Sequence, residues 1–147
     1  MDDLSLPTVA ELERDVAKSP DDAQALVRLA NAYWLEGRGP DVVGEIADRA
    51  RNMDRSNRGA WHLWALAEPN PRDRVERWRQ VTEQFPTDDL ARANLADNAA
   101  ALAGAEHDYS ALSLAIETYE QLLNTATYPP QRLALETALE TLRGWKI

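Results

Sequence analysis

Residues 22–37 read Asp-Ala-Gln-Ala-Leu-Val-Arg-Leu-Ala-Asn-Ala-Tyr-Trp-Leu-Glu-Gly, and this stretch decides the class of fold. The side chains expected to pack recur every three or four residues: Leu26, Leu29, Ala30 and Tyr33. That spacing lines one face of an α-helix. Asp21 stands three residues before Gln24, at the spacing of a helix-capping box, and Gly37 follows the last apolar residue. We therefore expect a helix that opens at Asp21 and stops at Gly37.

The same spacing continues along the chain, and short turns rich in Pro, Gly, Asp and Asn separate the segments. Alanine (24 residues) and leucine (19) dominate the composition, and no stretch alternates apolar with polar residues as a strand does. The chain is therefore expected to be all-α. Eight helices are expected, at about 8–18, 21–36, 40–53, 57–68, 70–85, 87–104, 108–126 and 130–143. We expect Thr87 to start the sixth helix and Gly104 to close it.

The chain also repeats itself. The positions that follow the second helix of each expected pair are separated by 35, 31 and 41 residues: Pro20, Arg55, Pro86 and Thr127. Intervals near this length are typical of stacked helix-turn-helix repeats. Because one such pair cannot bury its apolar face alone, neighbouring pairs must stack.

Motifs inside these repeats resemble those of the tetratricopeptide-repeat (TPR) family. Three segments carry the resemblance: Leu26-x-x-Leu29-Ala30-x-x-Tyr33, Trp61-x-x-Trp64-Ala65 and Ala115-x-x-x-Tyr119. The first two are similar to the first-helix signature of the family, and the third is similar to its second-helix pattern. In the first motif Leu26 and Ala30 replace the Trp and Gly of the family pattern, and further departures fall at Val43, Ala47, Glu68 and Arg74.

The resemblance, which covers about residues 9–143, implies a single TPR-like domain of the α-α superhelix class over residues 1–147. The expected parts are a leading helix at 8–18, repeats at 22–55, 57–86 and 87–127, and a capping helix at 129–143. Three aromatic residues occupy repeat-core positions and are assigned to the core: Trp61, Trp64 and Trp78.

In such an array the first helices of the pairs build a concave face, which can bind a segment of another protein. Counting from the packed positions predicts eight groove residues: Gln24, Val27, Asn31, Trp34, Leu35, His62, Leu66 and Asp97. The sequence is compatible with two placements of the Trp34 side chain, one in this groove and one against the packed face. Some members of the family hold a chaperone tail with a carboxylate clamp of Lys, Asn and Arg. Val27 stands where that clamp has its Lys, so binding of chaperone tails is not expected.

Residues suited to catalysis are few. The chain has no cysteine and two histidines, and it has no phosphate-binding glycine loop or zinc-protease motif. Glu106-His107-Asp108 joins three ionisable groups in an expected loop, which we interpret as a solvated turn with Asp108 capping the next helix. We expect no enzyme activity, no cofactor and no metal site.

The net charge of −9 indicates what kind of partner to expect. Nucleic acids and anionic membranes need a positive field, so neither is expected, and the partner protein is expected to be neutral or basic. One basic patch interrupts this pattern: Arg72, Arg74, Arg77 and Arg79. The acidic start of the sequence is unlike a secretory signal. A bacterial-looking cytoplasmic protein is expected, or a periplasmic one if a leader has been removed.

The preferred interpretation is a non-catalytic scaffold or adaptor that binds a peptide segment of a partner. One alternative is a self-assembly module that forms homo-oligomers through its terminal helices or through the Arg72 to Arg79 face. Another is a TPR subunit that presents apocytochrome segments in cytochrome c maturation, an interpretation that depends on similarity of layout alone.

Overall fold

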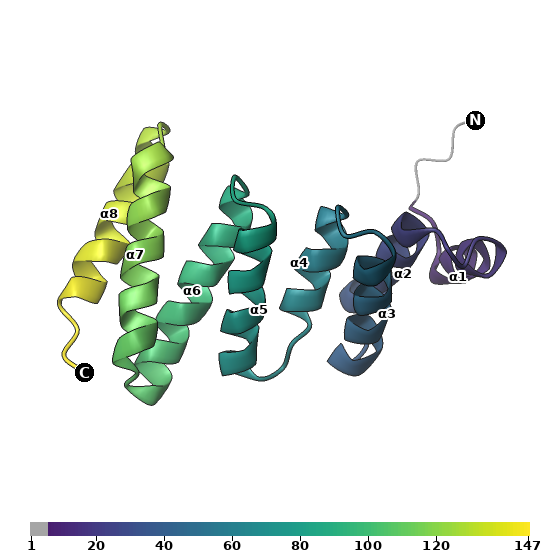
Figure 1. Ribbon diagram of the computed structural model, residues 1–147, viewed down its shortest axis with the longest axis horizontal. Helices are drawn as coiled ribbons and strands as arrows, with labels where there is room; N and C mark the ends of the chain where they lie inside the picture. The colour runs from purple at the N-terminus through teal and green to yellow at the C-terminus, as the bar shows by residue number, and fades with distance from the viewer. Residues whose placement is uncertain (1–5) are drawn as a thin grey trace. The chain divides into compact units, whose positions relative to one another are not determined.

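The computed structural model describes residues 6–147, and this part of the chain contains eight α-helices and no strand (Figure 1). The helices are α1 (Val9–Lys18), α2 (Ala23–Leu35), α3 (Pro40–Met53), α4 (Arg58–Leu66), α5 (Pro71–Gln84), α6 (Asp89–Glu106), α7 (Tyr109–Thr125) and α8 (Pro129–Arg143). The all-α prediction is therefore confirmed. The helix bounds lie close to those expected, because Pro, Gly and capping side chains are local signals.

The contacts divide the chain into two compact units, Met1–Pro69 and Asn70–Ile147. The first unit holds α1 to α4, and the second holds α5 to α8. The division falls between Pro69 and Asn70, inside the predicted repeat at 57–86. Each unit is described separately below.

In the first unit each helix packs on the next, and α2 also contacts α4. Its core combines large and small side chains that are wholly buried, namely Leu26, Ala30, Val43, Ala47 and Ala50. Because an alanine projects only one methyl group, the backbones of α2 and α3 can approach closely while the larger chains fill the remaining space. This is the packing that the small residues of the repeat motif predict.

In the second unit α5 packs on α6, α6 on α7, and α7 on α8. Small buried residues again line the contacts, among them Ala96, Ala99 and Ala115. A further cluster of Leu122, Ala126 and Leu135 joins α7 to α8. The last helix buries Leu135, Leu139 and Leu142, as its apolar spacing predicts.

Two predicted helix caps are wrong by one residue. The α2 cap is Asp22, whose carboxylate accepts hydrogen bonds from the backbone N–H groups of Gln24 and Ala25, so Asp21 stays outside the helix. The α6 cap is Asp88, which precedes the helix directly where Thr87 was expected. In both cases two candidate caps are adjacent, and the carboxylate nearer the first turn reaches the free N–H groups.

The predicted end of α6 at Gly104 is also wrong. The helix continues to Glu106, and His107 caps it in the left-handed conformation, with φ of 53°. A Cβ at Gly104 would lie 3.4 Å from the ring of Trp145, so this glycine lies inside the helix beside an aromatic ring. A glycine costs a helix only about 1 kcal/mol, which the packing of a long helix outweighs.

Candidate peptide-binding surface

Seven of the eight predicted groove residues lie in the first unit, five on α2 and two on α4. The first helices of consecutive pairs lie side by side there, as predicted. Gln24 accepts a hydrogen bond from the side-chain amide of Asn57 at 3.1 Å, and Asn57 caps α4. Asp97 lies on α6, in the second unit, and is treated separately.

Val27 is not a groove residue, since only 8% of it is exposed. It packs on the first turn of α4, where Gly59 leaves room for it. A Cβ at Gly59 would come within 3.1 Å of the Val27 Cγ1 atom. The groove assignment of Val27 is therefore wrong, because the close approach of α4 covers this part of α2.

The exposed side chains of α2 form one stripe beside α4. Its members are spaced by three or four residues, so they share a face of the helix: Gln24, Arg28, Asn31 and Leu35. Leu35 is 75% exposed, which is unusual for a large apolar residue within a helix. Arg28 is the member that sequence reasoning missed. It is the residue that falls between Gln24 and Asn31 in the stripe.

The exposed stripe of α4 lies beside the contact between Val27 of α2 and Gly59 of α4. Leu66 lies seven residues after Gly59 and therefore on the same face, and Gly59 is the residue that Val27 touches. Leu66 is 38% exposed and His62 is half-buried. We name the combined stripes the α2–α4 surface, formed by Gln24, Arg28, Asn31, Leu35, Arg58, His62 and Leu66.

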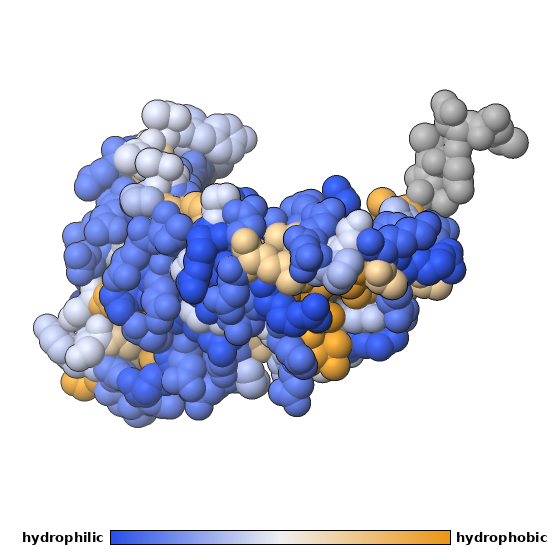
Figure 2. All heavy atoms as spheres, turned by 45° about the vertical axis from the view of Figure 1, so that its right-hand side comes forward, coloured by the Kyte–Doolittle hydropathy of each residue, from blue (hydrophilic) through white to orange (hydrophobic). Residues whose placement is uncertain are grey.

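Trp34 lies at the border of the α2–α4 surface. It follows Val27 by seven residues, which places it on the side of α2 that faces α4, and it is half-buried. The position is thus intermediate between the two expected ones. On the face drawn in Figure 2, hydrophobic side chains reach the surface in groups among hydrophilic ones. Exposed apolar residues on one face of a helix pair therefore merit attention as a binding site.

Arg51 of α3, whose side chain is mostly buried, packs on two aromatic side chains of α4. The Arg51 guanidinium of α3 lies 4.1 Å from the ring centre of Trp64 and 4.8 Å from that of Trp61. Its side chain is 13% exposed and forms an ion pair with Asp48 at 2.6 Å. The core assignment of Trp61, Trp64 and Trp78 is confirmed, because all three are buried. The cation over two aromatic rings fixes the face of α4 opposite the exposed stripe.

Asp97 has a partner within its own unit. Its carboxylate accepts a hydrogen bond from the Tyr119 hydroxyl of α7 at 2.5 Å. Burial raises the pKa of Tyr119, and the bond to Asp97 raises it further. The Asp97 side chain is exposed, and it also serves to hold α7 on α6.

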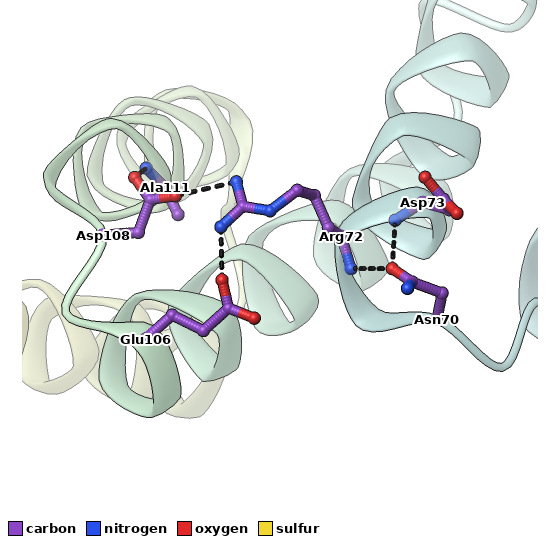
Figure 3. Close-up of polar contacts among 6 residues, drawn as sticks. All are labelled: Asn70, Arg72, Asp73, Glu106, Asp108 and Ala111. Carbon is purple, nitrogen blue, oxygen red and sulfur yellow. Dashed lines mark hydrogen bonds and ion pairs between the residues drawn. The ribbon is translucent and has the colours of Figure 1, made fainter.

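The basic patch and the acidic loop meet in the second unit (Figure 3). Arg72 binds Asp108 at 2.9 Å and also pairs with Glu106, so one guanidinium bridges both ends of the turn between α6 and α7. These bonds raise the pKa of Arg72, with Glu106 the larger cause. Asp108 caps α7, as predicted, by accepting from Ala111.

The rest of the patch is also engaged within the chain. Arg74 binds Asn98 at 2.8 Å, and Arg79 pairs with Glu76 and Glu83. The described residues contain no group of three or more His, Cys, Asp or Glu side chains placed to hold a metal. Nor does any of their helices have the length and apolar character needed to cross a bilayer.

Two crystal structures of MamA are among the solved proteins to which the chain is similar. The chain is similar to one of them with a TM-score of 0.72 and 13% identity, over 91% of this chain and 69% of that chain. It is similar to the other with a TM-score of 0.60 and 11% identity, over 92% of this chain and 84% of that chain. The fold is TPR-like. No protein-family model and no curated protein matches the sequence. At 13% and 11% identity the similarity to MamA concerns the fold alone. It supports the predicted fold class of antiparallel helix pairs.

Proposed function

We propose that this protein belongs to the TPR family and acts as a non-catalytic scaffold that binds a peptide segment of a partner protein on the α2–α4 surface. The observation that carries the proposal is the pair of neighbouring helices whose exposed stripes combine amide and large apolar side chains. Leu35 and Leu66 offer apolar area, and Asn31 offers a donor and an acceptor to a peptide backbone. The TPR-like fold supports the proposal, and the cytoplasm is the proposed location.

Selection from a displayed library of 12-residue peptides, with the whole protein as bait, tests this function. Peptides enriched on the wild-type protein are expected to bind the Leu35→Ala and Leu66→Ala variants at least about fivefold more weakly, the loss that marks an interface residue of importance. Leu133→Ala is the matched control, because Leu133 lies on α8 and is 65% exposed. Unchanged melting temperatures would show that the variants keep the fold. Equal weakening by all three variants, or the absence of enriched peptides, would count against the proposal.

A second candidate function is self-assembly through the last helix. Tyr128 and Leu133 of the α8 region are 66% and 65% exposed, which leaves apolar area for a second copy. The Arg72 to Arg79 face does not favour this role, because Arg72 and Arg79 pair with acidic groups of the same unit. Light scattering across protein concentration tests the idea. Association that Leu133→Glu abolishes supports it, and a monomer at every concentration contradicts it.

A further inference from the structure

The charges on the α2–α4 surface differ in sign from those of the protein as a whole. The chain has 25 acidic and 16 basic residues, yet neither α2 nor α4 contains an Asp or Glu between its first and last residue. Their charged residues are Arg28 and Arg58. We propose that this surface selects acidic peptide segments, an inference that rests on the proposed function and specifies its ligand.

Arg28 is the side chain best placed to bind a carboxylate of such a ligand. It is exposed in the centre of the α2 stripe, between Gln24 and Asn31. No hydrogen bond or ion pair joins it to any residue in the described range. Its five N–H donors are therefore available, and a carboxylate is the group that a guanidinium binds in a two-pronged way.

Within the helices of the first unit, the acidic residues lie on the two helices that flank α2, and further carboxylates lie in the turns at Asp21, Asp22, Glu36, Asp54 and Glu68. The acidic residues of α1 and α3 are Glu11, Glu13, Asp15, Asp41, Glu45 and Asp48. Along the exposed stripes between the helix ends, α2 and α4 thus offer partners to an acidic segment, whereas α1 and α3 carry the carboxylates that a basic segment would need. The negative charge of the chain does not prevent the latter, because salt at physiological strength screens charges beyond about 8 Å. Contact pairs decide the preference at short range, so the local sign matters more than the net charge of −9.

The spacing of the surface also specifies a pattern within the ligand. Arg28 and Leu35 are two helical turns apart, a rise of about 10 Å. An extended peptide advances about 3.3 Å per residue, so about three residues span that distance. The expected ligand therefore has a carboxylate about three positions from a large apolar side chain, which contacts Leu35 or Leu66.

The peptide selection described above provides the test. The peptides enriched on the wild-type protein are expected to carry net negative charge, with Asp or Glu about three positions from Leu, Phe, Trp or Met. A synthetic copy of the strongest peptide is then compared with an analogue in which Gln and Asn replace Glu and Asp. Arg28→Gln should weaken the acidic peptide about two- to fivefold, as expected for an exposed ion pair, and leave the uncharged analogue unchanged.

Arg28→Lys should retain most of the preference, and Arg49→Gln is the control. Arg49 is an exposed arginine on α3, outside the α2–α4 surface. Enriched peptides that are neutral or basic but still depend on Leu35 and Leu66 would overturn this inference and leave the proposed function standing. Equal effects of Arg28→Gln and Arg49→Gln would also overturn it. If no peptide is enriched, both the inference and the proposed function fail.

Discussion

Arg51 shows how one side chain can organise the first unit. Its guanidinium lies over the rings of Trp61 and Trp64, which meet edge to face with centroids 5.6 Å apart. Only 13% of its side chain is exposed, so the residue contributes apolar packing by its carbon stem as well as charge. No local sequence motif predicts the contact of Arg51 with Trp61 and Trp64, because it joins residues ten and more positions apart.

Replacing Arg51 by Ala should lower the free energy of unfolding by about 1–3 kcal/mol, through the loss of the cation–π contacts and of packing. Urea unfolding followed by tryptophan fluorescence measures the change. Arg49→Ala, two residues earlier on the exposed side of α3, should stay within about 0.5 kcal/mol of wild type. Similar losses of unfolding free energy in both variants would show that the stacking of Arg51 on the two rings does not stabilise the protein.

His107 occupies a backbone conformation that suits glycine. Its φ of 53° ends α6, and a residue with a Cβ loses about 1 kcal/mol or more in that region. His107→Gly is therefore expected to melt at a higher temperature than wild type, and His107→Val at a lower one, since a β-branched chain is worst there. Thermal unfolding by circular dichroism checks the order. The reverse order would mean that the left-handed turn is not present in solution.

At the scale of the helix, Gly104 and Trp145 explain why sequence reasoning ended α6 too early. A glycine at the end of an apolar pattern is a common stop signal, and the ring of Trp145 that lies beside it belongs to a distant segment. The cap at Asp108 was predictable because a capping side chain acts within the first turn of its own helix. Tertiary contacts, such as those of Gly104 with Trp145 and of Val27 with Gly59, have no local sequence signal that would predict them.

Gly104→Ala should stabilise the protein by about 0.5–1 kcal/mol. Alanine is the better helix former, and the added Cβ would meet the Trp145 ring at 3.4 Å, an ordinary van der Waals distance. Denaturant unfolding gives the sign of the change. A less stable variant would indicate that Trp145 packs more tightly on α6 than the structure shows.

The bridge from α5 to the turn between α6 and α7 should give the second unit sensitivity to acid. The bond from the Ala111 N–H, followed by that from Arg72, holds the pKa of Asp108 below its usual value. Its stabilising effect is therefore complete above the pKa of the unfolded chain, near 4, and is lost as the pH falls through the lower folded value.

Asp108→Asn keeps an oxygen that can cap α7 and removes the ion pair with Arg72. Its melting temperature should thus fall less than that of wild type between pH 6 and pH 3. Hydrogen exchange at the first-turn amides of α7 shows whether the cap persists. An identical pH dependence in the two proteins would contradict the role given to this bridge.

At the scale of the molecule, the sequence predicts the fold better than it predicts the site. Helical spacing and caps are local features of the sequence, so the helices of the described residues could be predicted. The division of the chain between Pro69 and Asn70, inside the expected repeat at 57–86, has no such local signal. The site depends on which faces two helices leave open. The burial of Val27, the bond between Asp97 and Tyr119 and the exposure of Arg28 all follow from packing. The expected neutral or basic partner rests on net charge, and the acidic ligand proposed here rests on the local charges of α2 and α4.

The most direct test of the binding surface is a titration of isotope-labelled protein with an enriched peptide, followed by amide chemical shifts. Our account predicts that the largest shifts fall on α2 and α4, at Gln24, Arg28, Asn31, Leu35 and Leu66, with those of α8 nearly unchanged. Shifts confined to the second unit, with α2 and α4 unaffected, would contradict it.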